Sequence, residues 1–194
     1  KRQTLHFNGK STLISLQNGG GKSVLVQMLT APFVHPKYRN TKDRLFESYF
    51  TTNKPSFILV EWALDQGAGY VLTGLMVRKS QDMEEDRKEN LDIIGIVSEY
   101  QSPCIQDIHH LPVVEKGKKE MILKNFNSCR QLFETYKKDR DMKFFYYDLT
   151  NYAQSRQYFN KLMEYQINYK EWETIIKKIN LKESGPVSYT HLRA

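Results

Sequence analysis

The sequence predicts a mixed α/β fold, a lobe built around a glycine loop that carries an antiparallel β-subdomain. The first observation is a glycine loop at residues 18–23, placed between an apolar stretch and a helix-like segment. The second is an apolar, strand-like segment at residues 56–78 with a glycine turn at its centre. The third is a series of one-sided apolar patterns typical of helices in the second half of the chain. With 194 residues and 40% hydrophobic content, the chain is long enough to bury one core of ordinary size.

The glycine loop has the composition of a phosphate cradle. Residues 12–16 are typical of a short buried strand and residues 24–29 of an apolar helix, which is the strand, turn and helix context of such loops. Three successive glycines each cost about 1 kcal/mol relative to alanine, so a fold keeps them where φ is positive or a ligand approaches the backbone. Asn18, Gly19, Gly20 and Gly21 would therefore bind phosphate oxygens.

The two residues after the glycines complete a nucleotide site for ATP and Mg²⁺. The Lys22 ammonium would hold the β- and γ-phosphates, and the Ser23 hydroxyl would ligate Mg²⁺. The strict G-x-x-x-x-G-K-[ST] pattern requires a glycine where this chain has Leu16, whereas the looser N-G-x-G-K-S form is met in full. A glycine hairpin with an incidental Lys-Ser pair is the alternative, and it leaves the apolar helix unexplained.

The remaining elements follow from local pattern. We expect a hairpin with strands at 56–65 and 70–78 around a turn at 66–69, and a connecting segment at 32–55 with one or two helical turns. Further along we expect an exposed loop at 79–90, a strand at 91–97, a loop at 103–112, a helix at 125–139, a strand at 143–149, and helices with apolar stripes at 158–163 and 172–179.

On these residues the chain resembles the N-terminal half of the ABC-type ATPase heads of the SMC, MukB and RecN group. Such heads open with a strand pair, here residues 4–7 and 12–16, then carry N-G-x-G-K-[ST] and a helix, and a β-subdomain follows. The resemblance extends over residues 4–180. It implies the N-terminal lobe of a P-loop NTPase at residues 1–184. This lobe would consist of the strand pair, loop and helix at 4–31, the hairpin at 56–78, and helices at 150–184 that lead toward a coiled coil.

The resemblance also implies that this chain is a fragment of the ATPase. The signature motif, the Walker B carboxylates and the switch histidine are not found here, and in similar proteins they lie in a C-terminal half-head far along the chain. The full-length protein would hydrolyse ATP, while the fragment alone would be nearly inactive.

The position of Gln154 resembles that of the Q-loop glutamine, which senses Mg²⁺ and the γ-phosphate in such heads. Gln157 is an equally good candidate by position. The alternative is that Gln154 is a glutamine at a helix start that faces water.

The partners implied are the C-terminal half-head, a second head in an ATP-sandwiched homodimer, DNA and accessory subunits. The functions implied are chromosome segregation, DNA repair or defence against foreign DNA. The net charge of +7 agrees with contacts to DNA phosphates. Lysines at 116–119 and at 137–143, the latter interleaved with aspartates, are equally typical of a solvated surface.

Two other classes of function stay open. A self-contained P-loop NTPase or kinase would need its own acceptor site and a carboxylate at the end of a strand. Glu61 and Asp148 are the only candidates for that carboxylate. A non-hydrolysing nucleotide-binding scaffold is the other, in which Leu16 marks a decayed loop.

Composition favours a cytoplasmic protein. No apolar run approaches the roughly 20 residues of a membrane span, and no signal peptide is visible. Cys104 and Cys129 are predicted to be reduced and structural, and His109 and His110 to be surface residues, because none has metal-ligand spacing. Residues 185–194 resemble sequencing-adapter read-through and are predicted to be a non-native tail, the alternative being a native turn with a short tail.

Overall fold

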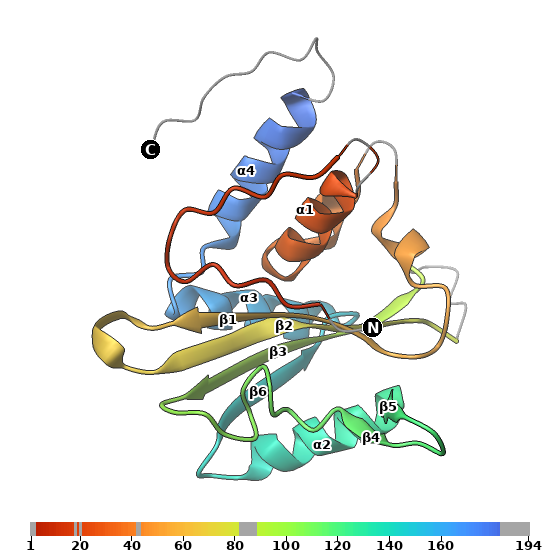
Figure 1. Cartoon of the computed structure of the whole chain (residues 1–194), viewed down its shortest axis with the longest axis vertical. Helices are drawn as coiled ribbons and strands as arrows, with labels where there is room; N and C mark the ends of the chain where they lie inside the picture. Colours follow the sequence, from red (N-terminus) through yellow and green to blue (C-terminus); the bar gives the residue numbers. More distant parts are fainter. Residues whose placement is uncertain (1–2, 18, 20, 42–43, 82–88, 183–194) are drawn as a thin grey trace.

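A four-stranded antiparallel sheet with helices on both faces forms the centre of the molecule (Figure 1). The structure is a computed structural model that describes residues 3–17, 19, 21–41, 44–81 and 89–182. The strand order is β1-β2-β3-β6, and every neighbouring pair is antiparallel. A mixed α/β fold with an antiparallel sheet is therefore confirmed. The strands are β1 (Ser56–Ala63), β2 (Tyr70–Lys79), β3 (Leu91–Tyr100) and β6 (Lys143–Asp148), and a small hairpin pairs β4 (Val114–Lys116) with β5 (Met121–Leu123).

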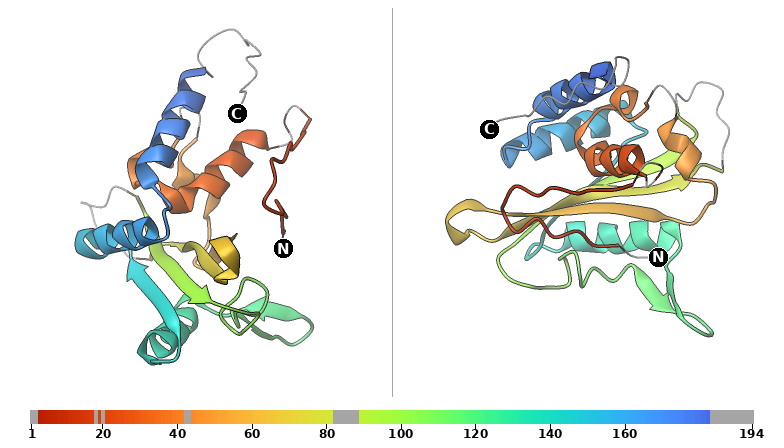
Figure 2. Two further views of the ribbon diagram at one scale, coloured as in Figure 1. Left: turned by 90° about the vertical axis from the view of Figure 1, so that its left-hand side faces the viewer. Right: turned by 45° about the horizontal axis from the view of Figure 1, so that its top comes forward.

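The helices divide between the two faces of the sheet. Helix α2 (Phe126–Lys138) covers one face, and α1 (Lys22–Thr30), α3 (Tyr152–Glu164) and α4 (Tyr169–Lys182) lie on the other (Figures 1 and 2). Three short 3₁₀ helices, Ala31–Phe33, Pro36–Tyr38 and Phe46–Tyr49, shape the connector between α1 and β1. None of the described helices is long and apolar enough to cross a membrane.

The predicted hairpin is confirmed, and its turn explains its glycines. The ladder runs from Ser56 opposite Val77 to Ala63 opposite Tyr70. The turn places Gln66 and Gly67 at positive φ, 57° and 73°. Gly69 has φ of 108°, and a Cβ there would lie 2.4 Å from the carbonyl oxygen of Tyr100, so only glycine fits this close approach.

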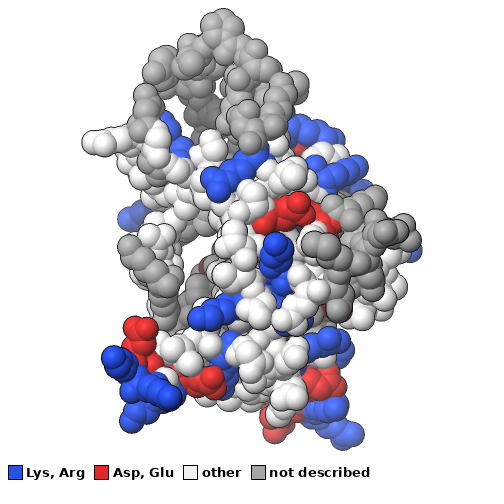
Figure 3. Space-filling model, turned by 90° about the vertical axis from the view of Figure 1, so that its right-hand side faces the viewer, with Lys and Arg blue, Asp and Glu red and all other residues white. Residues whose placement is uncertain are grey.

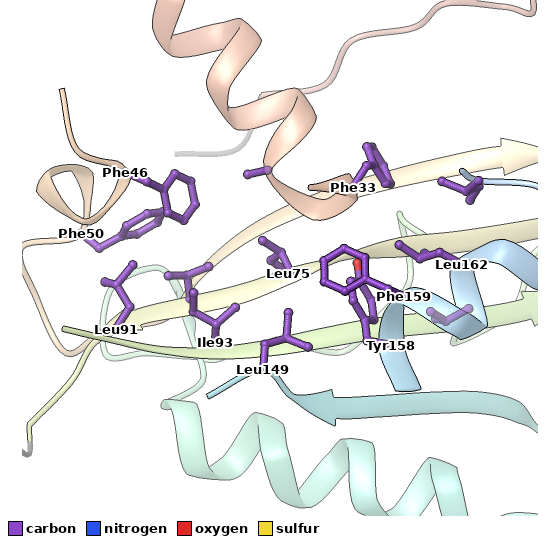
Figure 4. Packing of buried hydrophobic residues seen from close by; sticks show 14 of the residues in the cluster. Phe33, Phe46, Phe50, Leu75, Leu91, Ile93, Leu149, Tyr158, Phe159 and Leu162 are labelled. Carbon is purple, nitrogen blue, oxygen red and sulfur yellow. The ribbon is translucent and has the colours of Figure 1, made fainter. Parts of the chain in front are cut away.

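Two hydrophobic clusters hold the helices to the sheet, one on each face. Figure 4 shows the first cluster, which contains Phe33 of the 3₁₀ helix after α1, Phe159 and Leu162 of α3, and Leu75 of β2. The second packs Phe126, Cys129 and Phe133 of α2 against the opposite face. Because both faces are covered, β2 and β3 are buried along almost their whole length instead of alternating.

Several other expectations are confirmed with small changes. Strand β3 continues three residues beyond the predicted end, and the apolar face of α2 is buried as predicted at Phe126, Cys129, Phe133 and Tyr136. The stripe on α3 is buried at Tyr158, Phe159 and Leu162, whereas Met163 is 41% exposed. The β4–β5 hairpin was not predicted. The predicted tail at 185–194 and most of the loop at 79–90 lie outside the described residues.

The predicted strand pair at 4–7 and 12–16 is wrong. Residues 3–17 form neither helix nor strand and lie on the outside of the fold (Figure 2), with Leu13 95% exposed. Within the described chain, the segment makes one backbone hydrogen bond, 3.0 Å from the Lys10 N–H to the Phe7 carbonyl across a turn at Asn8 and Gly9. The turn was predicted correctly. Apolar β-propensity does not make a strand where no neighbouring strand accepts and donates the ladder hydrogen bonds.

Candidate functional site

The glycine loop enters α1 with the backbone conformation expected of a phosphate cradle. Gly19 and Gly21 have φ of 80° and 83°. A Cβ at either position would meet nothing within 4 Å, so the left-handed backbone, rather than crowding, selects glycine there. Asn18 and Gly20 lie outside the described residues. No side chain of the described residues caps α1, and its first turn holds no acidic residue, so the positive dipole end of the helix is not neutralised by a carboxylate of that turn.

Lys22 and Ser23 open into a cavity of about 260 Å³ beside α1. One wall is the face of α1 that carries Lys22, Ser23, Val26, Gln27 and Thr30. The facing walls are the connector residues Tyr38, Arg39, Asn40 and Thr41, and Ile176 and Ile179 of α4. Three segments that are distant in the sequence therefore surround the residues predicted to hold the β- and γ-phosphates and Mg²⁺.

A buried amide ties the connector to α1. Gln27 is only 5% exposed. Its side-chain Nε2 donates to the carbonyl oxygen of Arg39 at 2.6 Å and to that of Arg44 at 3.4 Å. Its Oε1 accepts from the Tyr49 hydroxyl at 2.8 Å. Asn40 Oδ1 accepts from the Phe46 N–H at 2.8 Å and closes the same loop. The wall opposite Lys22 and Ser23 is thus held in place by hydrogen bonds rather than by apolar packing alone.

A buried arginine lies below this loop. Arg39 is 2% exposed, and its Nε donates to the Ala31 carbonyl at 3.2 Å. Its Nη1 lies 3.7 Å from Glu89 Oε2, too far for a good hydrogen bond, and within the described residues neither Nη atom has a hydrogen-bond partner. Burial lowers the pKa of Arg39 and raises that of Glu89, because burial disfavours the charged forms. The charges of Arg39 and Glu89 therefore partly neutralise each other, but the two Nη atoms and Glu89 Oε1 have no hydrogen-bond partner among the described residues.

Gln154 is not brought to the cavity. Its Oε1 accepts from the Asp148 N–H at 2.9 Å, and its own N–H donates to Asn151 Oδ1 at 3.1 Å, so both groups close the turn between β6 and α3. It is absent from the cavity walls, whereas Lys22 and Ser23 line them. Gln157 is exposed on α3. In this structure Gln154 makes local contacts, and its proposed role as Mg²⁺ and γ-phosphate sensor has no geometric support.

The carboxylates considered for a self-contained enzyme are engaged in local contacts. Glu61 accepts from the Tyr100 hydroxyl and, at 3.4 Å, from the Ile108 N–H. Asp148 accepts from the Thr150 N–H at 3.0 Å and from its hydroxyl at 2.6 Å. Neither lines the cavity beside α1.

His109 and His110 lie at the surface, as predicted. His109 is exposed, and the His110 side chain is 61% exposed and lies 2.7 Å from Asp107 Oδ2. The described part of the chain holds no group of three side chains that could bind a metal. Both cysteines are unpaired, and burial raises the pKa of the Cys129 thiol to about 11, which keeps it protonated.

Figure 3 shows the distribution of basic side chains on one face of the molecule. There, the lysines and arginines of the described residues stand among uncharged and acidic residues, and they do not form a continuous basic band of the kind that binds DNA.

Sequence reasoning missed Gln27, Arg39 and Asn40. The available signal was a glutamine within an otherwise apolar helix segment at 24–29, which marks a buried polar group in need of partners.

Comparisons with protein-family models, with curated proteins and with solved structures find no match. The function is therefore argued from the geometry of the site.

Proposed function

We propose that the start of α1 binds the phosphates of ATP together with Mg²⁺, and that the chain is the ATP-binding half of an SMC-like, DNA-associated ATPase. The observation that carries the proposal is the pair of left-handed glycines, Gly19 and Gly21, leading into a helix start that the described side chains leave uncapped. Lys22 and Ser23 follow at once and line a cavity. Left-handed glycines, a helix dipole and a cation in one place favour a polyphosphate over a neutral ligand.

Each residue has a distinct role in this site. The amides of the glycine loop would wrap phosphate oxygens, and the exposed Lys22 ammonium would neutralise the β- and γ-phosphates. Mg²⁺ fits the donor set, because it is commonly held by one or two protein oxygens and by the phosphates of the substrate. The Ser23 hydroxyl would supply that protein oxygen, and the metal would neutralise phosphate charge.

Hydrolysis would need groups that the cavity does not contain. No carboxylate of the described residues lines it, so we propose that a general base or water-positioning group comes from the C-terminal half-head or from a second head. ATP would then be held between two heads, and its hydrolysis would open and close an assembly around DNA in the cytoplasm, in chromosome segregation, DNA repair or defence against foreign DNA. Accessory subunits belong to the same proposal.

Calorimetric titration of Mg-ATP into the 194-residue chain tests the proposal. Binding should be lost in Lys22→Ala and retained in Lys178→Ala, which removes an equal charge from an exposed position of α4. Equal binding by the chain and by Lys22→Ala would overturn it. Hydrolysis that appears only after the C-terminal half is added supports the split head, whereas hydrolysis by the chain alone indicates a compact P-loop enzyme.

A further inference from the structure

We infer that Gln27 is a positioning residue that lets this site distinguish a nucleoside triphosphate from a diphosphate, acting through Asn40. The inference rests on the proposed function, because it concerns the terminal phosphate of the ATP that we propose binds at Lys22 and Ser23. Gln27 lies one helical turn after Ser23, and both line the cavity.

The Gln27 amide has no role in building its own helix. Its side-chain donor and acceptor are both used on the connector, where the partners are Arg39, Arg44 and Tyr49. The shortest contact, 2.6 Å, reaches the carbonyl of Arg39, which belongs to the peptide that carries Asn40. Because the amide is buried, these hydrogen bonds are not exchanged for water, and the peptide before Asn40 is held at a set position against α1.

Two residues of that wall carry donors that no hydrogen bond of the described residues uses: the Nη atoms of Arg39, which are buried, and Nδ2 of Asn40, which belongs to a partly exposed residue. The Oδ1 atom of Asn40 is used by the Phe46 N–H. The neighbouring Thr41 hydroxyl is instead occupied on both sides by Arg44, at 3.2 and 3.1 Å. Asn40 shares the cavity with Lys22 and Ser23, the pair proposed to hold the β- and γ-phosphates and the metal. A donor on the wall facing that pair is placed to meet the terminal phosphate, which ADP lacks.

The test compares the ratio of ADP to ATP dissociation constants in the unmodified chain, two single variants, their double variant and a control variant, with Mg²⁺ present. Gln27→Met keeps the side-chain length and removes both hydrogen-bonding ends. It should weaken ATP binding about tenfold and leave ADP binding unchanged, as expected for one lost hydrogen bond to a charged group. Asn40→Ala should give the same loss. The double variant should lose no more than either single one, because both remove one contact.

Thr135→Val is the control. The Thr135 hydroxyl also bonds to a carbonyl of its own helix, that of Gln131 at 3.0 Å, but Thr135 lies on α2, on the other face of the sheet, and does not line the cavity. Its nucleotide ratio should match that of the unmodified chain.

The outcomes separate the two proposals. Equal weakening of ATP and ADP in Gln27→Met, or no weakening, would overturn the inference while Lys22-dependent binding stands. Absence of Lys22-dependent binding of both nucleotides overturns the proposed function itself. If Gln27→Met does not fold, Asn40→Ala decides alone, because Asn40 is on a partly exposed loop: an unchanged ratio there contradicts the inference.

Discussion

His35 and Glu173 join the connector after α1 to helix α4 across 138 positions of the chain. The Nδ1 atom of His35 lies 2.5 Å from Glu173 Oε1, and the His35 backbone N–H donates to the same oxygen at 3.2 Å. The imidazole also packs on Phe159, with ring centroids 4.1 Å apart, and against the edge of Tyr169 at 4.9 Å. This contact fixes the near end of α4, the helix that supplies the apolar wall of the cavity.

Glu173→Ala should therefore loosen α4. We expect a loss of about 1–3 kcal/mol in the free energy of unfolding, because two donors at a half-buried position lose a charged acceptor. Glu173→Gln should lose less, since an amide oxygen still accepts. Urea unfolding measures both, with Glu171→Ala as the control on the exposed side of α4. An equal loss in Glu171→Ala would contradict the assignment.

Gly95 should not tolerate alanine. A Cβ at this position of β3 would lie 2.6 Å from the ring of Tyr158, which is fully buried and anchored by its hydroxyl to the Pro32 carbonyl at 3.0 Å. Overpacking of this kind costs about 1–3 kcal/mol. Thermal or urea unfolding measures the loss. Adding Tyr158→Leu to Gly95→Ala should cost less than the sum of the two single changes; strict additivity would show that the ring is not the obstacle.

Asp107 should make the fold sensitive to acid. Burial alone would raise the pKa of this carboxyl, but hydrogen bonds from the side chain and backbone of His110 and from the N–H groups of His109 and Cys104 outweigh it and lower the pKa below the ordinary value of 3.8. The unfolded state then binds the proton more tightly, so this stabilisation is present above pH 3.8 and is lost as the pH falls through the lower folded pKa.

The measurement is the urea midpoint at about pH 6 and at about pH 3, on either side of the ordinary aspartate pKa. Asp107→Asn should be less stable than the unmodified chain at the higher pH, and this difference should shrink at the lower pH. Asp65→Asn, at an exposed turn, should track the unmodified chain at both. A difference that does not change with pH would argue against an ionised Asp107 in the fold.

Removing one partner of the Arg39–Glu89 pair should lower the free energy of unfolding more than replacing both partners by apolar residues. Arg39→Met leaves a carboxylate beside a buried site without its cation, and we expect a loss of about 3–5 kcal/mol. Arg39→Met combined with Glu89→Met should be more stable than Arg39→Met alone, because no buried charge remains. Chemical unfolding of the three variants checks this order, and a double variant less stable than both single ones would contradict it.

Ser23→Ala should weaken ATP binding only when Mg²⁺ is present, by about tenfold, because the hydroxyl is proposed to act as a metal ligand and not as a phosphate donor. Calorimetry in Mg²⁺ and in a chelator separates the two. A loss of the same size in the chelator would assign the hydroxyl to the phosphates.

Prediction from sequence succeeded where a signal was local and its partner lay nearby in the chain. The hairpin at 56–78 combined two apolar runs with a glycine turn, and α2 showed its apolar face at regular spacing. The failure at 12–16 has the opposite cause: the residues have strand composition, but a strand exists only where another strand pairs with it. The sensor role of Gln154 stays a prediction: its place after β6 fits a sensor, and in this structure its side chain accepts a hydrogen bond from the adjacent turn.

The sequence by itself determined the helices, the hairpin and the left-handed glycines before α1, because short-range sterics and apolar periodicity act within a few residues. The tertiary structure alone decided that residues 3–17 remain outside the sheet, that Gln27 holds the connector, and that His35 meets Glu173. Each of these depends on which groups from distant parts of the chain are brought together and removed from water. The free energy of a polar contact depends on how far both partners are buried, and the residues next to either partner in the sequence do not set that burial.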